Sequence, residues 1–144
     1  MEDFVTFEIA KKLKEKGFKQ KCLAYYDVED NVGLLYNTQY TDEALPCQYT
    51  NLLQCHNTCE AETQPDDSDF CVDAPTISQV LKWLREEKKL HVHPEPAYFS
   101  KVGLWEVYIV NINDYVQCST NKEYDSYEQA ALAGIEYVLD NNLI

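Results

Sequence analysis

Apolar residues recur at helical spacing in three segments of the chain. In the first segment, Thr6 can cap a helix whose apolar positions Ile9 and Leu13 fall on one face. Gly17 then provides a stop, and Phe18 is placed to fold back on Leu13 as the apolar contact of a Schellman turn. The pattern therefore predicts a helix that begins after Thr6 and ends before Gly17.

Two further helices are predicted by the S/T-x-x-E/Q spacing, with which the first amides of a helix are satisfied reciprocally. Thr76 and Gln79 open one helix, and Ser126 and Gln129 open the other. Their apolar stripes are Ile77, Val80, Leu81 and Leu84 in the former and Tyr127, Ala131, Gly134, Ile135, Val138 and Leu139 in the latter. Because Gly134 costs about 1 kcal/mol of helix propensity, we expect it to allow a close approach of its helix to a sheet.

Short runs of aromatic and aliphatic residues predict strands at 21–26, 33–36, 90–93, 104–112 and 115–119. The first two flank a polar stretch and predict a hairpin. Pro94 and Pro96 are expected to end the strand that begins at Leu90. A turn at Asn113 and Asp114 should bring the last strand back antiparallel to its predecessor.

This order of elements predicts an α+β fold, with a small antiparallel sheet and about three helices packed mainly on one face. The 144 residues fit a single domain, residues 1–144, with an acidic, cysteine-containing loop or insertion at about 41–73. Within that loop, Tyr49, Leu52 and Leu53 can form one short amphipathic turn or helix.

Charge is distributed unevenly along the chain. Residues 22–81 carry eleven Asp and Glu and no Lys or Arg, whereas ten of the twelve basic residues lie within 11–21 and 82–89. Nearly all of the net charge of −13 therefore resides in one stretch. Such polarisation concerns partners and solubility rather than fold. It also disfavours direct binding to nucleic acid, whose phosphates would be repelled.

No catalytic motif accompanies this charge pattern. Cys22 and Cys118 fall on predicted strands, and the four glycines form no phosphate-binding loop. Residues 1–4 do not start a signal peptide, and no apolar stretch approaches membrane-spanning length. We expect a non-enzymatic cytoplasmic protein that binds no membrane and whose six cysteines stay reduced.

Four cysteines have the chemistry of a structural zinc site: Cys47, Cys55, Cys59 and Cys71. Only Cys55 and Cys59 have the knuckle spacing that such sites favour. The alternative is a set of small, partly buried apolar residues. We therefore expect no cofactor, with structural zinc as the alternative.

A second candidate metal site is formed by His91 and His93, which project from the same face of a strand that Glu95 continues. Pro94 and Pro96 disturb that strand. Polar residues of an edge strand are therefore the favoured interpretation.

Three blocks of the sequence resemble one group of proteins. The blocks are 4–18 (FVTFEIAKKLKEKGF), 74–86 (APTISQVLKWLRE) and 126–136 (SYEQAALAGIE), and the isolated Trp105 also fits. Together they are similar to small uncharacterised proteins of bacteriophages and integrated mobile elements of gut bacteria. The resemblance implies a phage or mobile-element origin and a bacterial host cytoplasm. It implies no functional residues, since no activity is established for the group.

These observations predict a protein that binds a partner protein through an acidic surface. The candidate contact residues are Asp66, Asp67, Asp69 and Asp73, with Trp83 as an anchor if it is exposed. Three alternatives to this role stay open: the acids only keep the protein soluble, they imitate phosphates and occupy a DNA-binding protein, or a zinc-stabilised module makes the contact. A fourth is an enzyme, which would require folding to bring distant Cys, His and acidic residues together in a cleft. The oligomeric state is not predicted.

Overall fold

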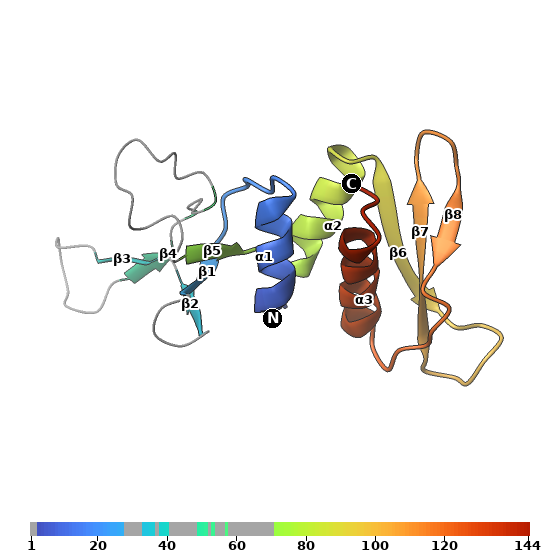
Figure 1. Ribbon diagram of the computed structural model, residues 1–144. Coiled ribbons are helices and arrows are strands. Elements are labelled where there is room, and N and C mark those ends of the chain that lie inside the picture. Colours follow the sequence, from blue (N-terminus) through green and yellow to red (C-terminus); the bar gives the residue numbers. More distant parts are fainter. Residues whose placement is uncertain are drawn as a thin grey trace. The chain divides into compact units, whose positions relative to one another are not determined.

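The computed structural model describes residues 3–27, 33–36, 38–40, 49–51, 53, 57 and 71–144 (Figure 1). Three helices and two three-stranded antiparallel sheets among these residues confirm the α+β class. The described strands thus form two three-stranded sheets and a separate two-stranded pair, where the sequence suggested one sheet. Backbone contacts divide the chain into two compact units, residues 4–75 and residues 1–3 with 76–144. The single domain stays a prediction, because such a division does not measure independent folding.

In the unit of residues 4–75, one helix packs on a sheet with the strand order β2-β1-β5. A separate antiparallel pair is formed by β3 and β4. The elements are α1 (Phe7–Glu15), β1 (Ala24–Asp27), β2 (Leu34–Tyr36), β3 (Thr38–Tyr40), β4 (Tyr49–Asn51) and β5 (Cys71–Ala74). Strands β1 and β2 pair antiparallel, with Tyr25 opposite Leu35, as the predicted hairpin requires.

Both predicted ends of α1 are confirmed. The Thr6 side chain accepts a hydrogen bond from the Ile9 amide. At the other end, the Phe18 amide donates to the Leu13 carbonyl at 3.0 Å while Gly17 has a φ of 82°. This left-handed glycine lets the chain reverse so that Phe18 becomes fully buried.

Two predictions for the long loop were wrong. Tyr49–Asn51 is strand β4 rather than an amphipathic turn or helix, because it pairs with β3. Cys71–Ala74 is strand β5, which pairs with β1 and places Val72 opposite Tyr26. Both strands depend on partners at least nine residues away, which a local pattern does not reveal.

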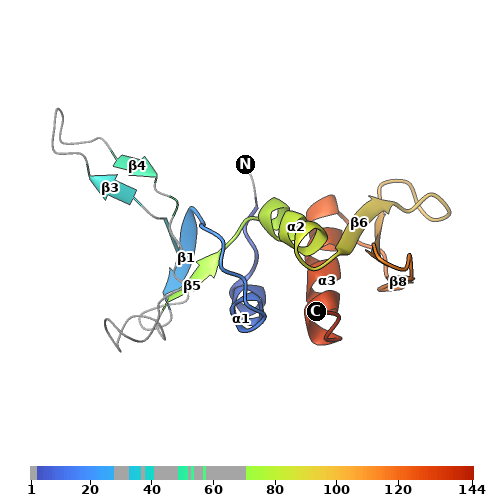
Figure 2. The same cartoon turned by 90° about the horizontal axis from the view of Figure 1, so that it is seen from above.

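The unit that contains residues 76–144 has two helices beside a three-stranded sheet (Figure 2). The strand order of this sheet is β6-β7-β8. The elements are α2 (Ile77–Glu86), β6 (Leu90–Pro96), β7 (Trp105–Asn111), β8 (Gln117–Ser119) and α3 (Tyr127–Asp140). Helix α3 contacts β6 and β7, and α2 contacts β6 and α3. Both helices begin where predicted. Thr76 and Gln79 form both bonds of a capping box, and the Ser126 side chain accepts from the Gln129 amide.

Residues on β6 and β7 alternate between buried and partly exposed. Val92, Val107 and Ile109 are among the buried ones, and α3 covers them. The intervening residues project from the opposite face of the sheet. The alternation predicted for residues 104–112 is thereby confirmed.

Strand β6 continues through Pro94 to Pro96, so the predicted end at Pro94 was wrong. The Ala97 amide donates to the Leu104 carbonyl, and the Ile112 amide donates to the Lys89 carbonyl. Since hydrogen-bonded pairs recur at every second residue, the nitrogens of Pro94 and Pro96 point away from β7. An edge strand tolerates proline at such positions because no ladder bond is lost.

Gly134 of α3 lies directly against the sheet, as its sequence position suggested. A Cβ atom at this position would lie 2.6 Å from Val92 Cγ1 and 2.7 Å from Val107 Cγ2. Real Cβ atoms do not approach other carbons so closely, so only glycine fits without a shift of the helix or of the two valine side chains.

We expect Gly134→Ala to lower the free energy of unfolding by about 1–2 kcal/mol, because overpacking outweighs the gain in helix propensity. Chemical denaturation of the full chain measures this change. Val107→Ala removes one of the two contacted methyl groups, so Gly134→Ala should cost less in that background. A rise in stability on Gly134→Ala alone would disprove the close approach.

Candidate functional site

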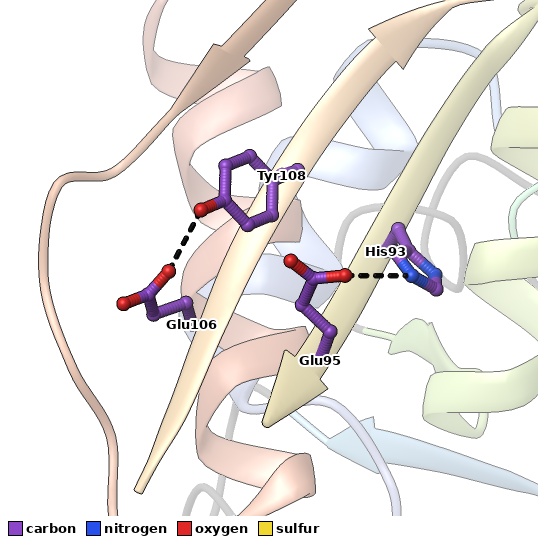
Figure 3. A network of polar contacts seen from close by, with 4 residues as sticks. All are labelled: His93, Glu95, Glu106 and Tyr108. Carbon is purple, nitrogen blue, oxygen red and sulfur yellow. Dashed lines mark hydrogen bonds and ion pairs between the residues drawn. The ribbon is translucent and has the colours of Figure 1, made fainter. Parts of the chain in front are cut away.

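Ionisable and polar side chains lie together on the face of the β6-β7-β8 sheet opposite α3. We call it the open sheet face. The pairing of β6 with β7 places His93 opposite Tyr108 and Glu95 opposite Glu106 (Figure 3). Its residues are His91, His93, Glu95, Glu106, Tyr108, Val110, Gln117 and Ser119.

The two histidines on β6 stack on each other. Their ring centroids are 5.3 Å apart and the rings are inclined by 24°. His93 Nε2 lies 3.4 Å from Glu95 Oε2, an ion pair when the imidazole is protonated. Burial lowers the pKa of His91, and the positive charges of His93 and Arg85 lower it further. The neutral imidazole of His91 is therefore favoured.

On β7, the Tyr108 hydroxyl donates a hydrogen bond of 2.7 Å to Glu106 Oε2 (Figure 3). This bond to Glu106 raises the pKa of Tyr108, and burial and the nearby carboxylate charges of Glu106 and Glu95 raise it further. Tyr108 therefore stays a hydrogen-bond donor over the physiological pH range.

A shallow hollow of about 350 Å³ lies on this face. It is lined by His91, His93, Glu95, Tyr108, Val110 and Gln117. A neighbouring hollow of about 470 Å³ adjoins it beyond Tyr108, toward Asn121 and Lys122. Imidazole, carboxylate, phenol and amide groups thus meet at one surface. They offer donors and acceptors to a polar ligand, and proton exchange through the histidines.

The sequence placed His91, His93 and Glu95 on one strand face, and the structure confirms that placement. It did not foresee Glu106 and Tyr108 as their neighbours, because that depends on the register between β6 and β7. Two features of the sequence carried information on this register: the alternation of residue types along β7, and the length of the connection between β6 and β7.

Metal ligation receives no geometric support from this part of the chain. Among the described residues, no three or more His, Cys, Asp or Glu side chains are arranged to hold a metal ion. Of the four candidate zinc ligands, only Cys71 lies within them, on β5, where its carbonyl accepts a hydrogen bond from Lys14 Nζ. Cys47, Cys55 and Cys59 lie outside the described residues.

Two of the five predicted partner-contact residues are buried, so their assignment was wrong. Asp73 is fully buried on β5, and its Oδ2 accepts the Asn57 amide at 2.9 Å. Trp83 is 1% exposed on α2, and Lys88 Nζ lies 5.0 Å from its ring centroid. Its proposed role required exposure. Asp66, Asp67 and Asp69 lie outside the described residues.

Asn57 is a structural residue that the sequence did not single out. Besides the bond to Asp73, its side-chain Oδ1 accepts the Asp73 amide at 3.1 Å and its Nδ2 donates to the Phe18 carbonyl at 3.0 Å. One asparagine therefore joins two segments that are remote in sequence. No local pattern marks it, because all its partners are remote.

No protein-family model matches this chain, and comparisons with curated proteins and with solved structures found no similar protein. In the part of the chain that the structure describes, no helix has the length and apolar character needed to cross a bilayer.

We expect Arg85→Gln to raise the pKa of His91 toward its ordinary value, because a positive charge that opposes protonation is removed. NMR titration of the His91 ring measures the change, and Lys122→Gln is the control for the loss of one exposed positive charge. An unchanged pKa of His91 in Arg85→Gln would contradict this interpretation.

The same lowered pKa predicts how stability depends on pH. The unfolded chain binds a proton at His91 more readily than the folded chain does. The contribution of His91 to the free energy of unfolding is therefore complete above about pH 6.5, the ordinary histidine pKa. It is lost as the pH falls through the lower folded value. Denaturation at several pH values should show that the free energy of unfolding falls less on acidification in His91→Gln than in the wild type.

Asn57→Ala removes the two side-chain bonds, to the Asp73 amide and to the Phe18 carbonyl, and leaves these two backbone groups without the asparagine partner. The backbone amide of residue 57 still donates to Asp73 Oδ2. We expect the free energy of unfolding to fall by about 2–3 kcal/mol. Thermal or chemical denaturation measures the loss. Asn113→Ala, at an exposed turn, is the matched control and should change stability by less than about 0.5 kcal/mol.

Proposed function

We propose that this protein is a non-enzymatic accessory protein of a bacteriophage or mobile element, which binds a protein partner in the bacterial cytoplasm. Its acidic segment, residues 22–81, would make the contact. The origin and the location rest on the resemblance of three sequence blocks. The binding role rests on the distribution of charge.

The observation that carries the proposal is the run of sixty residues with eleven acidic side chains and no basic one. A surface of one sign attracts a partner of the opposite sign and increases the rate of encounter. The partner is therefore expected to present a basic surface. Charge of this kind contributes more to association rate and specificity than to affinity.

Burial reduces the number of candidate residues that can contact the partner. Asp73 is withdrawn from the contact set by its burial beside Asn57, and Trp83 by its burial in α2. The candidate contacts that stay are Asp66, Asp67 and Asp69, which lie within four consecutive residues and carry three of the eleven charges.

The test is affinity capture with the tagged full chain from a bacterial lysate, followed by association kinetics with the purified partner. We expect the association rate to fall as salt rises, because salt screens charges over about 8 Å at physiological ionic strength. Replacing Asp66, Asp67 and Asp69 by Asn should lower the association rate several-fold and change the dissociation rate little.

The matched control replaces Glu86, Glu123 and Glu128 by Gln, three exposed acids outside the segment. An equal loss in both triple variants would mean that only net charge acts. No loss in either would show that the acids serve solubility. A DNA-binding partner that duplex DNA displaces would favour nucleic-acid mimicry instead.

A further inference from the structure

The connection between β6 and β7 presents apolar side chains fully to solvent. The exposed fraction is 104% for Phe99, 106% for Val102 and 76% for Tyr98. The loop is nevertheless ordered by hydrogen bonds, since the Ala97 amide donates to the Leu104 carbonyl at 2.8 Å and the Ser100 amide donates to the Ala97 carbonyl at 3.2 Å. Clustered, preorganised apolar side chains on a surface mark an interaction site.

A small apolar hollow lies at the other end of the same sheet. Its volume is about 160 Å³. It is lined by Leu90, Ile109, Asn111, Asp114, Val116, Cys118 and Leu143. An apolar cavity of about 150 Å³ is known to hold one benzene ring. The hollow therefore has the size and character to accept one phenyl group.

The loop and the hollow of one molecule cannot meet. Pro96 and Trp105 pair at the loop end of the hairpin, whereas Leu90 and Asn111 pair at the hollow end. Six residue steps along a strand span about 20 Å. Figure 1 likewise shows the β6-β7 connection at the end of the sheet opposite the β7-β8 turn. Any phenyl ring from this loop that fills the hollow must come from another molecule.

We propose that Phe99 of one copy inserts into the apolar hollow of a second copy of this chain. The charges agree with this contact, because Lys101 follows Phe99 by two residues and Asp114 lines the hollow. The contact would bring these opposite charges to the same interface. The contact is independent of the acidic segment and of the proposed protein partner.

A second copy fits the loop better than a lipid surface does. The net charge of −13 opposes approach to an anionic bilayer, and the loop offers only Lys101 as a cation. Copies of the chain also repel one another at long range, but salt screens this repulsion at physiological ionic strength. Apolar burial and one short-range ion pair then supply the attraction.

Sedimentation velocity of the full chain at physiological salt, from micromolar to millimolar concentration, tests the contact. Wild type should self-associate reversibly. Phe99→Ser and Val116→Arg should each weaken association about tenfold or more, by removing the ring or by placing a charge at the rim of the hollow. Both residues are exposed, so the fold should be retained, which circular dichroism verifies.

The matched controls are Leu35→Ser, which removes another exposed apolar side chain, and Ile112→Arg, which adds a charge to the same turn outside the hollow. Both should associate like wild type. Equal losses in the controls would show that general surface hydrophobicity or charge is responsible, and would overturn the proposal.

Mixing the two deficient variants gives the decisive result. Phe99→Ser keeps an intact hollow, and Val116→Arg keeps an intact loop. Equal amounts should therefore form a heterodimer through one contact, and nothing larger. The proposal is overturned if wild type stays monomeric at every concentration, or if mixing restores no association. Phe99-dependent binding of monomers to anionic vesicles would assign the loop to a membrane instead.

Discussion

The unit of residues 76–144 depends on the close contact between α3 and the β6-β7 hairpin at Gly134. Its missing side chain brings the helix backbone onto Val92 and Val107, closer than any other residue permits. Close contact expels water from one face of the sheet and buries its aliphatic residues. The alternating geometry of the strands then directs every second side chain to the other face. The position of His93, Glu95 and Tyr108 is thus a consequence of how the opposite face is packed.

The two faces and the two ends of the β6-β7-β8 sheet therefore carry different kinds of side chain. The open sheet face couples ionisable groups, since one histidine faces another and a phenol is held by a carboxylate. The ends carry apolar groups instead, with an exposed loop around Phe99 at one end and a small hollow at the other. The prolines of β6 keep that edge from offering a full hydrogen-bonding ladder. In this sheet, the faces and the ends are therefore more suitable for binding a ligand or a partner than the β6 edge is.

Local signals in the sequence predicted local structure well. The caps at Thr6, Thr76 and Ser126 and the reversal at Gly17 all formed as expected, because each involves groups within a few residues. Strands β4 and β5 were missed, because their pairing energy comes from distant segments. The end assigned at Pro94 was wrong for a related reason. Only the position of β6 at an edge makes proline harmless there.

The sequence by itself determined the helices, the strand alternation, the small-residue face of α3 and the polarised charge, since these follow from the order of residues along the chain. Only the tertiary structure decided which side chains are exposed. Asp73 looked like a member of an acidic surface, yet its pairing with Asn57 places it in the interior. Trp83 could act as an anchor only if it were exposed, and it is buried. Exposure is a property of what packs against a residue, and those neighbours come from segments that the residue's own sequence context does not contain.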